Sequence, residues 1–305
     1  MKGASVEIIK VGGSFLSSPE SLGDVLSLAK STQKAILVLS AFSGVTDRLQ
    51  GIHSMGKASR ISEFQSIVSW HANLLSKSPG FHSEFPPDTL ADGLSSGTSQ
   101  NGGLLEWIGN ADHDEFLSIG EKLSALTISE YLKYHRIRCH RIFSDDLGVT
   151  VSEGKEGRTI DIEATSIKAR SIIDSLLANN DVIVTTGFFG RGTDGRVKIL
   201  GRNSSDYSAV GIAASLGHDR VTLLKDVRGI YRADPKHLPP GSHHIPVLSY
   251  MEALDICRSG SRVVHPSAVE LAMKTGIQIS VRRHGDSTSG TLICKNQGTA
   301  SYLKG

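Results

Sequence analysis

The chain contains 305 residues; 39% are hydrophobic, 21% are charged, and 33 basic against 31 acidic side chains leave a formal net charge of +2. This length suits one large domain or two closely packed lobes, and this composition can build a sizeable core. The near balance of charge, without any block of like charge, argues against nucleic acid or an anionic membrane as the main partner.

No stretch has the length and apolar composition of a signal-peptide core or a membrane span, so we expect a cytoplasmic protein. The cysteines, Cys139, Cys257 and Cys294, are odd in number and widely spaced. This spacing fits reduced thiols better than disulfides or a zinc site. The histidines also lack companions at ligand spacing, so no metal site built from protein side chains is expected.

The chain opens with a predicted strand, a glycine turn and a helix. Residues 6–11 are a short β-branched run that ends at Gly12 and Gly13, and apolar residues then recur at helical spacing from Leu22 to Ala29. Residues 35–41 form a second apolar run of strand length. A β-α-β unit of this kind implies parallel strands that are covered by helices.

Two stretches in the first two thirds of the chain lack this pattern. Residues 76–103 are rich in Ser, Gly, Pro and Asp and predict a loop with a loosely structured insertion. Residues 144–161 contain several glycines and predict a second irregular stretch that could cover a site.

The alternation of strand and helix returns in the second half of the chain. Residues 181–186 and 221–224 read as strands, residues 208–216 as a helix, and residues 277–281 as the last strand of the core. Strands that alternate with helices predict an open α/β sheet covered on both faces. Ligands of such sheets bind beyond the carboxyl ends of the strands.

The end of the first strand has the composition of an anion site. Lys10 brings a full positive charge, and Gly12 and Gly13 let backbone N–H groups close on a phosphate as the chain passes through Ser14 toward a helix. The same residues are also compatible with an ordinary turn between a strand and a helix.

Hydroxyl and carboxylate side chains follow at two further places. Ser40 and Thr46 come directly after the second strand and suit a small polar ligand, although Thr46 and Asp47 also suit a helix cap. Glu121 stands near the start of an apolar helical pattern, where it could bind the ammonium group of a ligand or interact favourably with the helix dipole.

The stretch GRNSSDYS, residues 201–208, is the most informative. Arg202 suits a bidentate grip on a carboxylate, Asp206 can orient a lysine or reach a metal, and Ser205 is one of the small polar residues between them. The stretch could also be a Ser/Asp helix cap.

The stretch KDVRGIY, residues 225–231, follows a predicted strand and precedes ADPK. Tyr231 offers an aromatic face, while Asp226 and Lys236 are suited to ribose or phosphates. Without further context it reads as a charged turn.

These motifs, in this order, resemble those of the aspartate kinases of the amino-acid kinase family. The matching segments are KVGGSF from Lys10, SAFSGVTD from Ser40, SIGE from Ser118, GRNSSDYSA from Gly201, KDVRGIY from Lys225, ADPK from Ala233 and SRVVHP from Ser261. The resemblance implies a three-layer αβα sandwich with an open, mainly parallel sheet and two lobes. Residues 1–190 would form the lobe for the amino acid and residues 191–305 the lobe for the nucleotide.

The resemblance also implies a role for each motif residue. The catalytic pair would be Lys10, at the transferring phosphate, and Asp206, which organises that lysine. The residues implied for substrate binding are Ser40, Thr46, Glu121, Arg202 and Ser205. The residues implied for nucleotide binding are Lys10, Gly12, Gly13, Ser14, Lys225, Asp226, Tyr231, Lys236 and Arg262.

The implied reaction is ATP-dependent phosphorylation of the side-chain carboxylate of L-aspartate, with Mg²⁺, to give 4-phospho-L-aspartate, the first step toward lysine, threonine and methionine. Two alternatives stay open: a family member that acts on a different amino or carboxylic acid in specialised metabolism, and a catalytically silent, ligand-binding regulatory subunit. A homodimer is also left open. Because the chain ends soon after residue 293, no ACT regulatory domain is expected.

The chain departs from the family motifs at several positions. Asn203 and Ser204 replace a glycine pair, Val11 replaces a phenylalanine, Lys225 replaces a threonine, and Arg262 stands where the family has a lysine. The changes beside Arg202 bear on the identity of the acid substrate.

Overall fold

The computed structural model describes residues 6–95, 103–155, 157–231, 244–259, 263–285 and 290–295. The strands of its main sheet are β1 (Val6–Val11), β2 (Lys34–Leu39), β3 (Cys139–Arg141), β6 (Val182–Thr186), β9 (Arg220–Leu224), β10 (Val247–Ser249), β11 (Gln278–Arg282) and β12 (Thr291–Cys294). A smaller sheet contains β4 (Thr150–Gly154), β5 (Gly157–Ile160), β7 (Phe189–Gly192) and β8 (Val197–Ile199).

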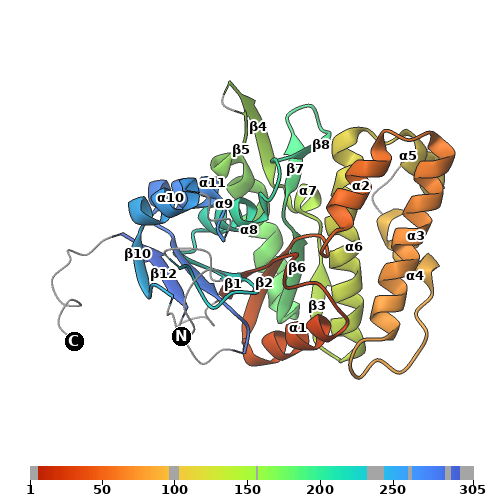
Figure 1. Cartoon of the computed structure of the whole chain (residues 1–305), viewed down its shortest axis with the longest axis horizontal. Coiled ribbons are helices and arrows are strands. Elements are labelled where there is room, and N and C mark those ends of the chain that lie inside the picture. The colour runs from red at the N-terminus through yellow and green to blue at the C-terminus, as the bar shows by residue number, and fades with distance from the viewer. Residues whose placement is uncertain are drawn as a thin grey trace.

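The helices surround these sheets (Figure 1). They are α1 (Glu20–Ser31), α2 (Val45–His53), α3 (Lys57–Ser76), α4 (Pro87–Ser95), α5 (Gly103–Asn110), α6 (His113–Tyr134), α7 (Ser144–Leu147), α8 (Ile162–Asn179), α9 (Ser205–Leu216), α10 (Tyr250–Arg258) and α11 (Pro266–Thr275). Among the described residues, no helix combines the length and the apolar character that crossing a bilayer requires.

The main sheet runs in the order β10-β12-β11-β9-β1-β2-β6-β3. Its neighbouring strands pair in parallel except for β11 with β12. Since β1 pairs with β2 on one side and with β9 on the other, the sheet is continuous from the strands of residues 1–190 to those of residues 191–305.

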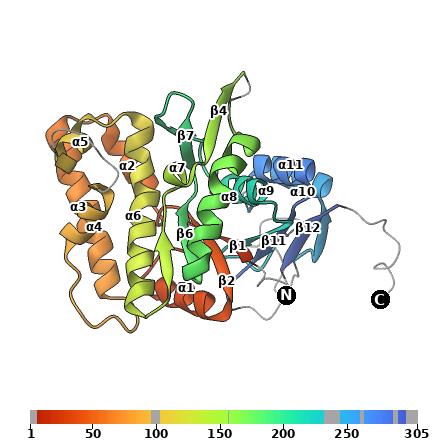
Figure 2. The ribbon, with the colours of Figure 1, turned by 180° about the vertical axis from the view of Figure 1, so that it is seen from behind.

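Helices cover both faces of this sheet, as the front and back views show (Figure 2). Along β1, Ile9 and Val11 belong to one buried cluster, with residues of α1 and α6, whereas Ile8 belongs to another, with residues of α8, α9 and α11. Successive side chains of a strand point to opposite faces, so a strand buried on both faces needs a continuous apolar run. This is the three-layer αβα sandwich with a mainly parallel sheet that the sequence predicts.

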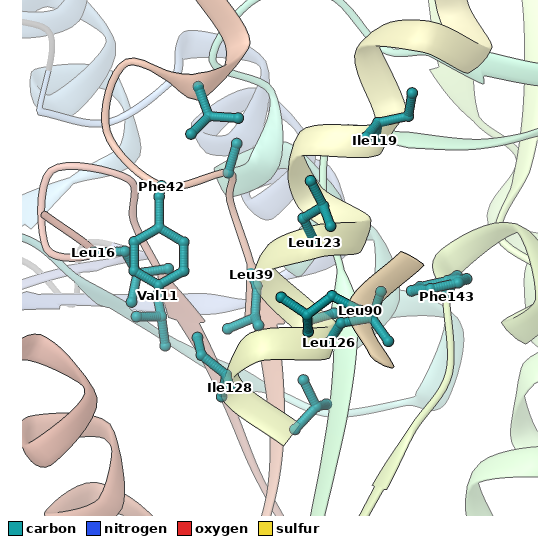
Figure 3. Packing of buried hydrophobic residues seen from close by; sticks show 14 of the residues in the cluster. Val11, Leu16, Leu39, Phe42, Leu90, Ile119, Leu123, Leu126, Ile128 and Phe143 are labelled. Atoms are coloured by element: carbon teal, nitrogen blue, oxygen red, sulfur yellow. The ribbon is translucent and has the colours of Figure 1, made fainter. Parts of the chain in front are cut away.

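Helix α6 joins the sheet to the helices α3 and α4. It begins at Asp112, whose side chain accepts a hydrogen bond from the backbone N–H of Glu115 at 2.9 Å. Figure 3 shows Leu123 and Leu126 of α6 in the same buried cluster as Leu39 of β2 and Leu90 of α4. Because α6 is buried along most of its length, it is held rigidly beside the sheet.

The irregular structure predicted for residues 76–103 is wrong in part. Helix α4 occupies Pro87–Ser95, where Pro87 suits a first helical position and Leu90 and Leu94 lie four residues apart on one buried face. The many Ser, Gly and Pro residues hid this short amphipathic pattern. Residues 96–102 lie outside the described part of the chain.

Two further expectations are also wrong. Residues 144–161 contain the short helix α7 and the antiparallel strands β4 and β5. Residues 277–281 do not end the core, because β12 inserts between β11 and β10. Strand β12 is only four residues long, too short for its periodicity to stand out, although its Ile293 is fully buried.

Candidate active site

A cleft of about 650 Å³ lies at the carboxyl ends of the parallel strands β1, β2 and β9. The turn after each strand contributes to it, together with the middle of α6 and the segment that leads into α9. Of the residues predicted for the site, those lining the cleft are Lys10, Gly13, Ser14, Ser40, Thr46, Glu121, Arg202, Ser205, Asp206 and Lys225.

Asp206, in the first turn of α9, binds two lysines from different strand ends. The Nζ atom of Lys10 lies 2.9 Å from Oδ1 of Asp206. The Nζ atom of Lys225 donates to both carboxylate oxygens, at 3.0 Å and 2.8 Å. The backbone N–H of His265 donates to Oδ2 at 3.2 Å. One carboxylate thus fixes two ammonium groups beside the cleft.

The cluster has two basic groups and one acidic group, and it is largely shielded from water. Lys10 and Asp206 are only 5% and 3% exposed. Burial lowers the pKa of Lys10 to about 8, although Asp206 opposes the shift. Burial alone raises the pKa of Asp206, but the ammonium groups of Lys10 and Lys225 outweigh it and hold this pKa well below its usual range. With both lysines protonated, the cluster carries one net positive charge, which suits an anionic ligand.

Packing requires a glycine at position 13 and leaves little room for a side chain at position 12. A Cβ on Gly13 would lie 2.7 Å from the carbonyl oxygen of Ala41, and a Cβ on Gly12 would lie 3.0 Å from Nζ of Lys10. The hydroxyl of Ser14 donates to Oδ1 of Asp226 at 3.1 Å, which ties this turn to the turn after β9. The backbone after β1 therefore carries no side chains at Gly12 and Gly13, and a hydrogen bond holds Ser14 in place.

Glu121 of α6 places a carboxylate in the cleft that is only half satisfied. Its Oε1 accepts from the backbone N–H of Ala41 at 3.1 Å, whereas its buried Oε2 has no partner among the described residues. The side chain is 3% exposed, and burial raises its pKa to about 8. A buried acceptor without a donor is unfavourable, so a ligand ammonium group would be stabilised here.

Arg202 lies at the exposed rim of the cleft. Its Nη2 contacts Oδ1 of Asp47, and both side chains are about 70% exposed. An exposed ion pair is weak and can exchange for a ligand carboxylate. Asn203, next to it, has a φ of 60°. Asparagine tolerates this left-handed conformation better than other non-glycine residues, which explains how it replaces a motif glycine.

Neither α2 nor α9 begins with a side-chain cap hydrogen bond, so the helix-cap interpretations are not supported. Helix α2 is preceded by Gly44, with no side-chain cap, so Thr46 and Asp47 lie inside its first turn. Ser204 occupies the N-cap position of α9 but makes no capping hydrogen bond. Asp206 is instead held by Lys10 and Lys225.

Not every residue singled out from the sequence lines the cleft. Asp226 reaches it only through Ser14, and the ring of Tyr231 packs edge-on against that of His244, with centroids 6.3 Å apart. Lys236 and Arg262 lie outside the described residues.

The cleft also contains residues that the sequence did not single out. Phe188, Ile199 and Cys257 supply apolar or weakly polar surface, and His265 supplies the N–H that contacts Asp206. His265 stands in the motif SRVVHP, so the motif was a usable signal. No local sequence pattern predicted Phe188 or Ile199 as cleft residues. Phe188 directly precedes β7 and Ile199 ends β8, and only the fold brings these strands to the cleft.

Comparisons with known proteins agree with this architecture. Residues 5–283 match the model of the amino acid kinase family. The chain belongs to the amino acid kinase family. This family member is 32% identical to an aspartokinase of Thermus thermophilus over 180 residues, which cover 59% of the chain and 43% of the relative. It is 26% identical to a bifunctional aspartokinase/homoserine dehydrogenase of Haemophilus influenzae over 306 residues, which cover 95% of the chain and 37% of the relative.

Solved structures show the same fold. The amino acid kinase chain superposes on E. coli aspartokinase III in complex with aspartate and ADP with a TM-score of 0.79 and 23% identity, covering 97% of this chain and 66% of that one. The chain spans less than half the length of the two curated relatives, 43% and 37%, and about two thirds of the aspartokinase III chain.

Proposed function

We propose that this amino acid kinase transfers the γ-phosphoryl group of ATP to the side-chain carboxylate of L-aspartate, giving 4-phospho-L-aspartate and ADP. The observation that carries the proposal is the cluster of Lys10, Asp206 and Lys225 in the same cleft as the half-satisfied Glu121. Relatives named aspartokinases, and the aspartokinase III structure with aspartate and ADP, support it.

The reaction requires positioning and positive charge more than a base. A side-chain carboxylate has an ordinary pKa of about 3.9 and is already ionised at neutral pH. Its oxygen attacks the γ-phosphorus, a new O–P bond forms, and the bond from phosphorus to the β–γ bridging oxygen breaks. Because both reactants are anions that must approach to about 3–3.5 Å, the ammonium groups of Lys10 and Lys225 offset their repulsion.

The amino acid is proposed to lie between α6 and the segment before α9. Glu121 would accept from its ammonium group, and Arg202 would exchange Asp47 for its α-carboxylate. Ser40, Thr46 and Ser205 line the same space and can donate hydroxyl hydrogen bonds to the remaining oxygens.

ATP is proposed to lie over the bare turn of Gly12, Gly13 and Ser14, near Lys225 and Asp226. Tyr231, Lys236 and Arg262 complete the proposed nucleotide residues. In this arrangement, residues 1–190 supply most of the amino-acid site, with Arg202 and Ser205 added from residues 191–305, and the nucleotide lies between the turn after β1 and residues 191–305.

We expect Mg²⁺ to enter this cleft together with ATP. The described residues contain no group of three or more His, Cys, Asp or Glu side chains that could hold a metal. Mg²⁺ commonly binds one or two carboxylates together with substrate phosphates, and Asp226 at the turn after β9 suits that role. When bound, it would neutralise charge on the phosphates.

The deciding experiment traps the acyl phosphate with hydroxylamine while ATP consumption is followed. We expect hydroxamate with aspartate, and a kcat at least about 100-fold lower for Lys10→Ala, because a donor to the transferring group is lost. ATP binding without hydroxamate from any acid would sink the proposal and favour a silent regulatory subunit.

A second candidate is a kinase for a different amino or carboxylic acid. It is favoured by Asn203, whose side chain lines the cleft beside Arg202 where the family motif has glycine. The same assay with glutamate and related acids separates the two, since the preferred acid shows the highest kcat/KM.

A further inference from the structure

A second cavity, also of about 650 Å³, lies across α6 from the proposed active site. Glu121 and Leu117 of α6 line the first cleft, whereas Glu115 and Lys122 line the second cavity. At about 100° per residue, Glu115 and Lys122 share a helix face that is roughly opposite to that of Leu117. The turn between β7 and β8 and the helices α5 and α7 form the remaining walls.

Two charged groups in this cavity are only partly satisfied by the described residues. The side chain of Lys122 is 11% exposed, and its Nζ lies 3.8 Å from Oδ2 of Asp145, beyond hydrogen-bonding distance. The same Nζ lies 5.4 Å and 5.3 Å from the ring centroids of Phe143 and Phe189, and it makes no hydrogen bond to a described residue. Asp145 is 7% exposed, and its Oδ1 is buried without a partner among the described residues.

The incomplete hydrogen bonding of these two groups indicates what kind of ligand the cavity would favour. Buried charged groups are normally paired and hydrogen-bonded, so a missing hydrogen bond to such a group is unfavourable. A donor in the ligand would satisfy Oδ1 of Asp145, and an acceptor would satisfy Nζ of Lys122. Oδ1 of Asp145 and Nζ of Lys122 therefore favour a ligand that carries both a hydrogen-bond donor and a hydrogen-bond acceptor.

The rest of the lining also has both signs of charge. Arg191 lies 3.4 Å from Asp145 and 3.2 Å from Asp146, so it is already engaged. The exposed side chain of Arg196 makes no ion pair with a described residue, and Glu115 stands on the α6 side. Apolar surface comes from the side chains of Leu94, Trp107 and Val197.

We propose that this second cavity binds a free α-amino acid with an apolar side chain. Its carboxylate meets Lys122 and Arg196, its ammonium group meets Asp145 and Glu115, and its hydrocarbon part lies against Trp107 and Val197. The four acidic side chains of the lining disfavour phosphates, and its three basic side chains disfavour simple cations. Both sets of charges disfavour uncharged apolar molecules. The site stands on its own geometry and does not depend on the reaction in the first cleft.

The experiment is calorimetric titration of the full 305-residue chain with each proteinogenic L-amino acid in turn. We expect an apolar amino acid such as leucine to bind the native chain. Lys122→Met keeps the hydrocarbon stem but loses the charge, and should weaken binding by at least about tenfold. Asp145→Asn should do the same.

Matched controls separate the site from general effects on the fold. Lys133→Met removes another α6 lysine, which is paired with Glu130 and exposed, and should leave binding unchanged. Thermal unfolding of every variant reports on folding. If Asp145→Asn does not fold, Arg196→Ala changes an exposed side chain and should still weaken binding.

Isopentylamine and 4-methylpentanoic acid represent the two charged halves of leucine, and each should bind more weakly than leucine. The proposal is overturned if no amino acid binds with a Kd below roughly 10 mM. It is equally overturned if Lys122→Met and Arg196→Ala bind like the native chain, or if either half-ligand binds as tightly as leucine.

Discussion

Asp206 accepts hydrogen bonds from Lys10, Lys225 and the backbone of His265, which belong to separate segments of the chain. The aspartate kinase motif that residues 225–231 resemble has threonine at the position of Lys225, so the second ammonium group is a departure from that motif. Its proximity also helps to lower the pKa of Lys10, after the larger effect of burial. The proposed phosphoryl site is thus more cationic than the motif alone implies.

Lys225→Thr, which restores the motif residue, should lower kcat about 10- to 100-fold, because a charge that stabilises the transferring phosphoryl group is lost. Steady-state kinetics of hydroxamate formation measure the effect. Lys133→Thr, on the exposed face of α6, is the matched control. An unchanged kcat in Lys225→Thr would show that the lysine only neutralises Asp206.

The pH dependence should be a narrow bell with its maximum near pH 8. Burial raises the pKa of Glu121 to about 8, so this carboxyl gains the charge that attracts an ammonium group only as the pH rises toward 8. Burial lowers the pKa of Lys10 to about 8, so its positive charge is lost as the pH rises further. The logarithm of kcat/KM for the acid should therefore rise and then fall.

The assignment of the two limbs can be tested with Glu121→Gln. This variant should lose the rise below pH 8 and keep the fall above it, at a lower overall kcat/KM. A profile for the native chain that is flat from about pH 6.5 to 9.5 would contradict both assignments.

The start of α9 illustrates how an element accommodates a motif change. Asn203 takes a left-handed conformation directly before the helix, and the following turn packs so closely on the end of β6 that a Cβ on Gly187 would lie 2.8 Å from Cβ of Ser205. A residue that cannot adopt this conformation would displace Arg202 and Asp206 together.

Asn203→Val should therefore destabilise the protein by about 1–2 kcal/mol, whereas Asn203→Gly should be close to neutral. Urea unfolding measures the difference. Equal stabilities for the two variants would mean that the backbone here can relax without cost.

Helix α4 is an element that the composition of residues 76–103 did not predict. Leu90 is fully buried against α6, so Leu90→Ala should lower the free energy of unfolding by about 2–5 kcal/mol. Leu105→Ala removes the same atoms from a side chain that is 42% exposed and should change stability by less than about 0.5 kcal/mol. Chemical denaturation compares them, and a small loss for Leu90→Ala would argue against the packing of α4.

At the scale of the whole molecule, a continuous parallel sheet brings the functional groups together. The turns after β1, β2 and β9 meet at one edge, and α6 crosses behind them with one face on each cavity. A single buried helix therefore carries both Glu121 and Lys122, which places the second cavity next to the proposed substrate site.

The sequence by itself determined four of the core strands, the fold class and the charged and hydroxyl residues at the centre of the cleft. Strands β1, β2, β6 and β9 were predictable because a parallel strand buried on both faces must be a continuous apolar run. Most motif residues of the cleft were predictable because they follow strand ends, where ligands of such sheets bind. These signals are local, so they can be recognised without knowledge of the fold.

Only the tertiary structure decided which distant groups share a partner. No local pattern places Lys10 and Lys225 on the same carboxylate, seats β12 beside β11, or brings Lys122 and Asp145 together in a second cavity. These features depend on contacts between segments far apart in the chain. Periodicity and motif spacing report on the environment of one segment at a time, so they cannot specify which segments meet.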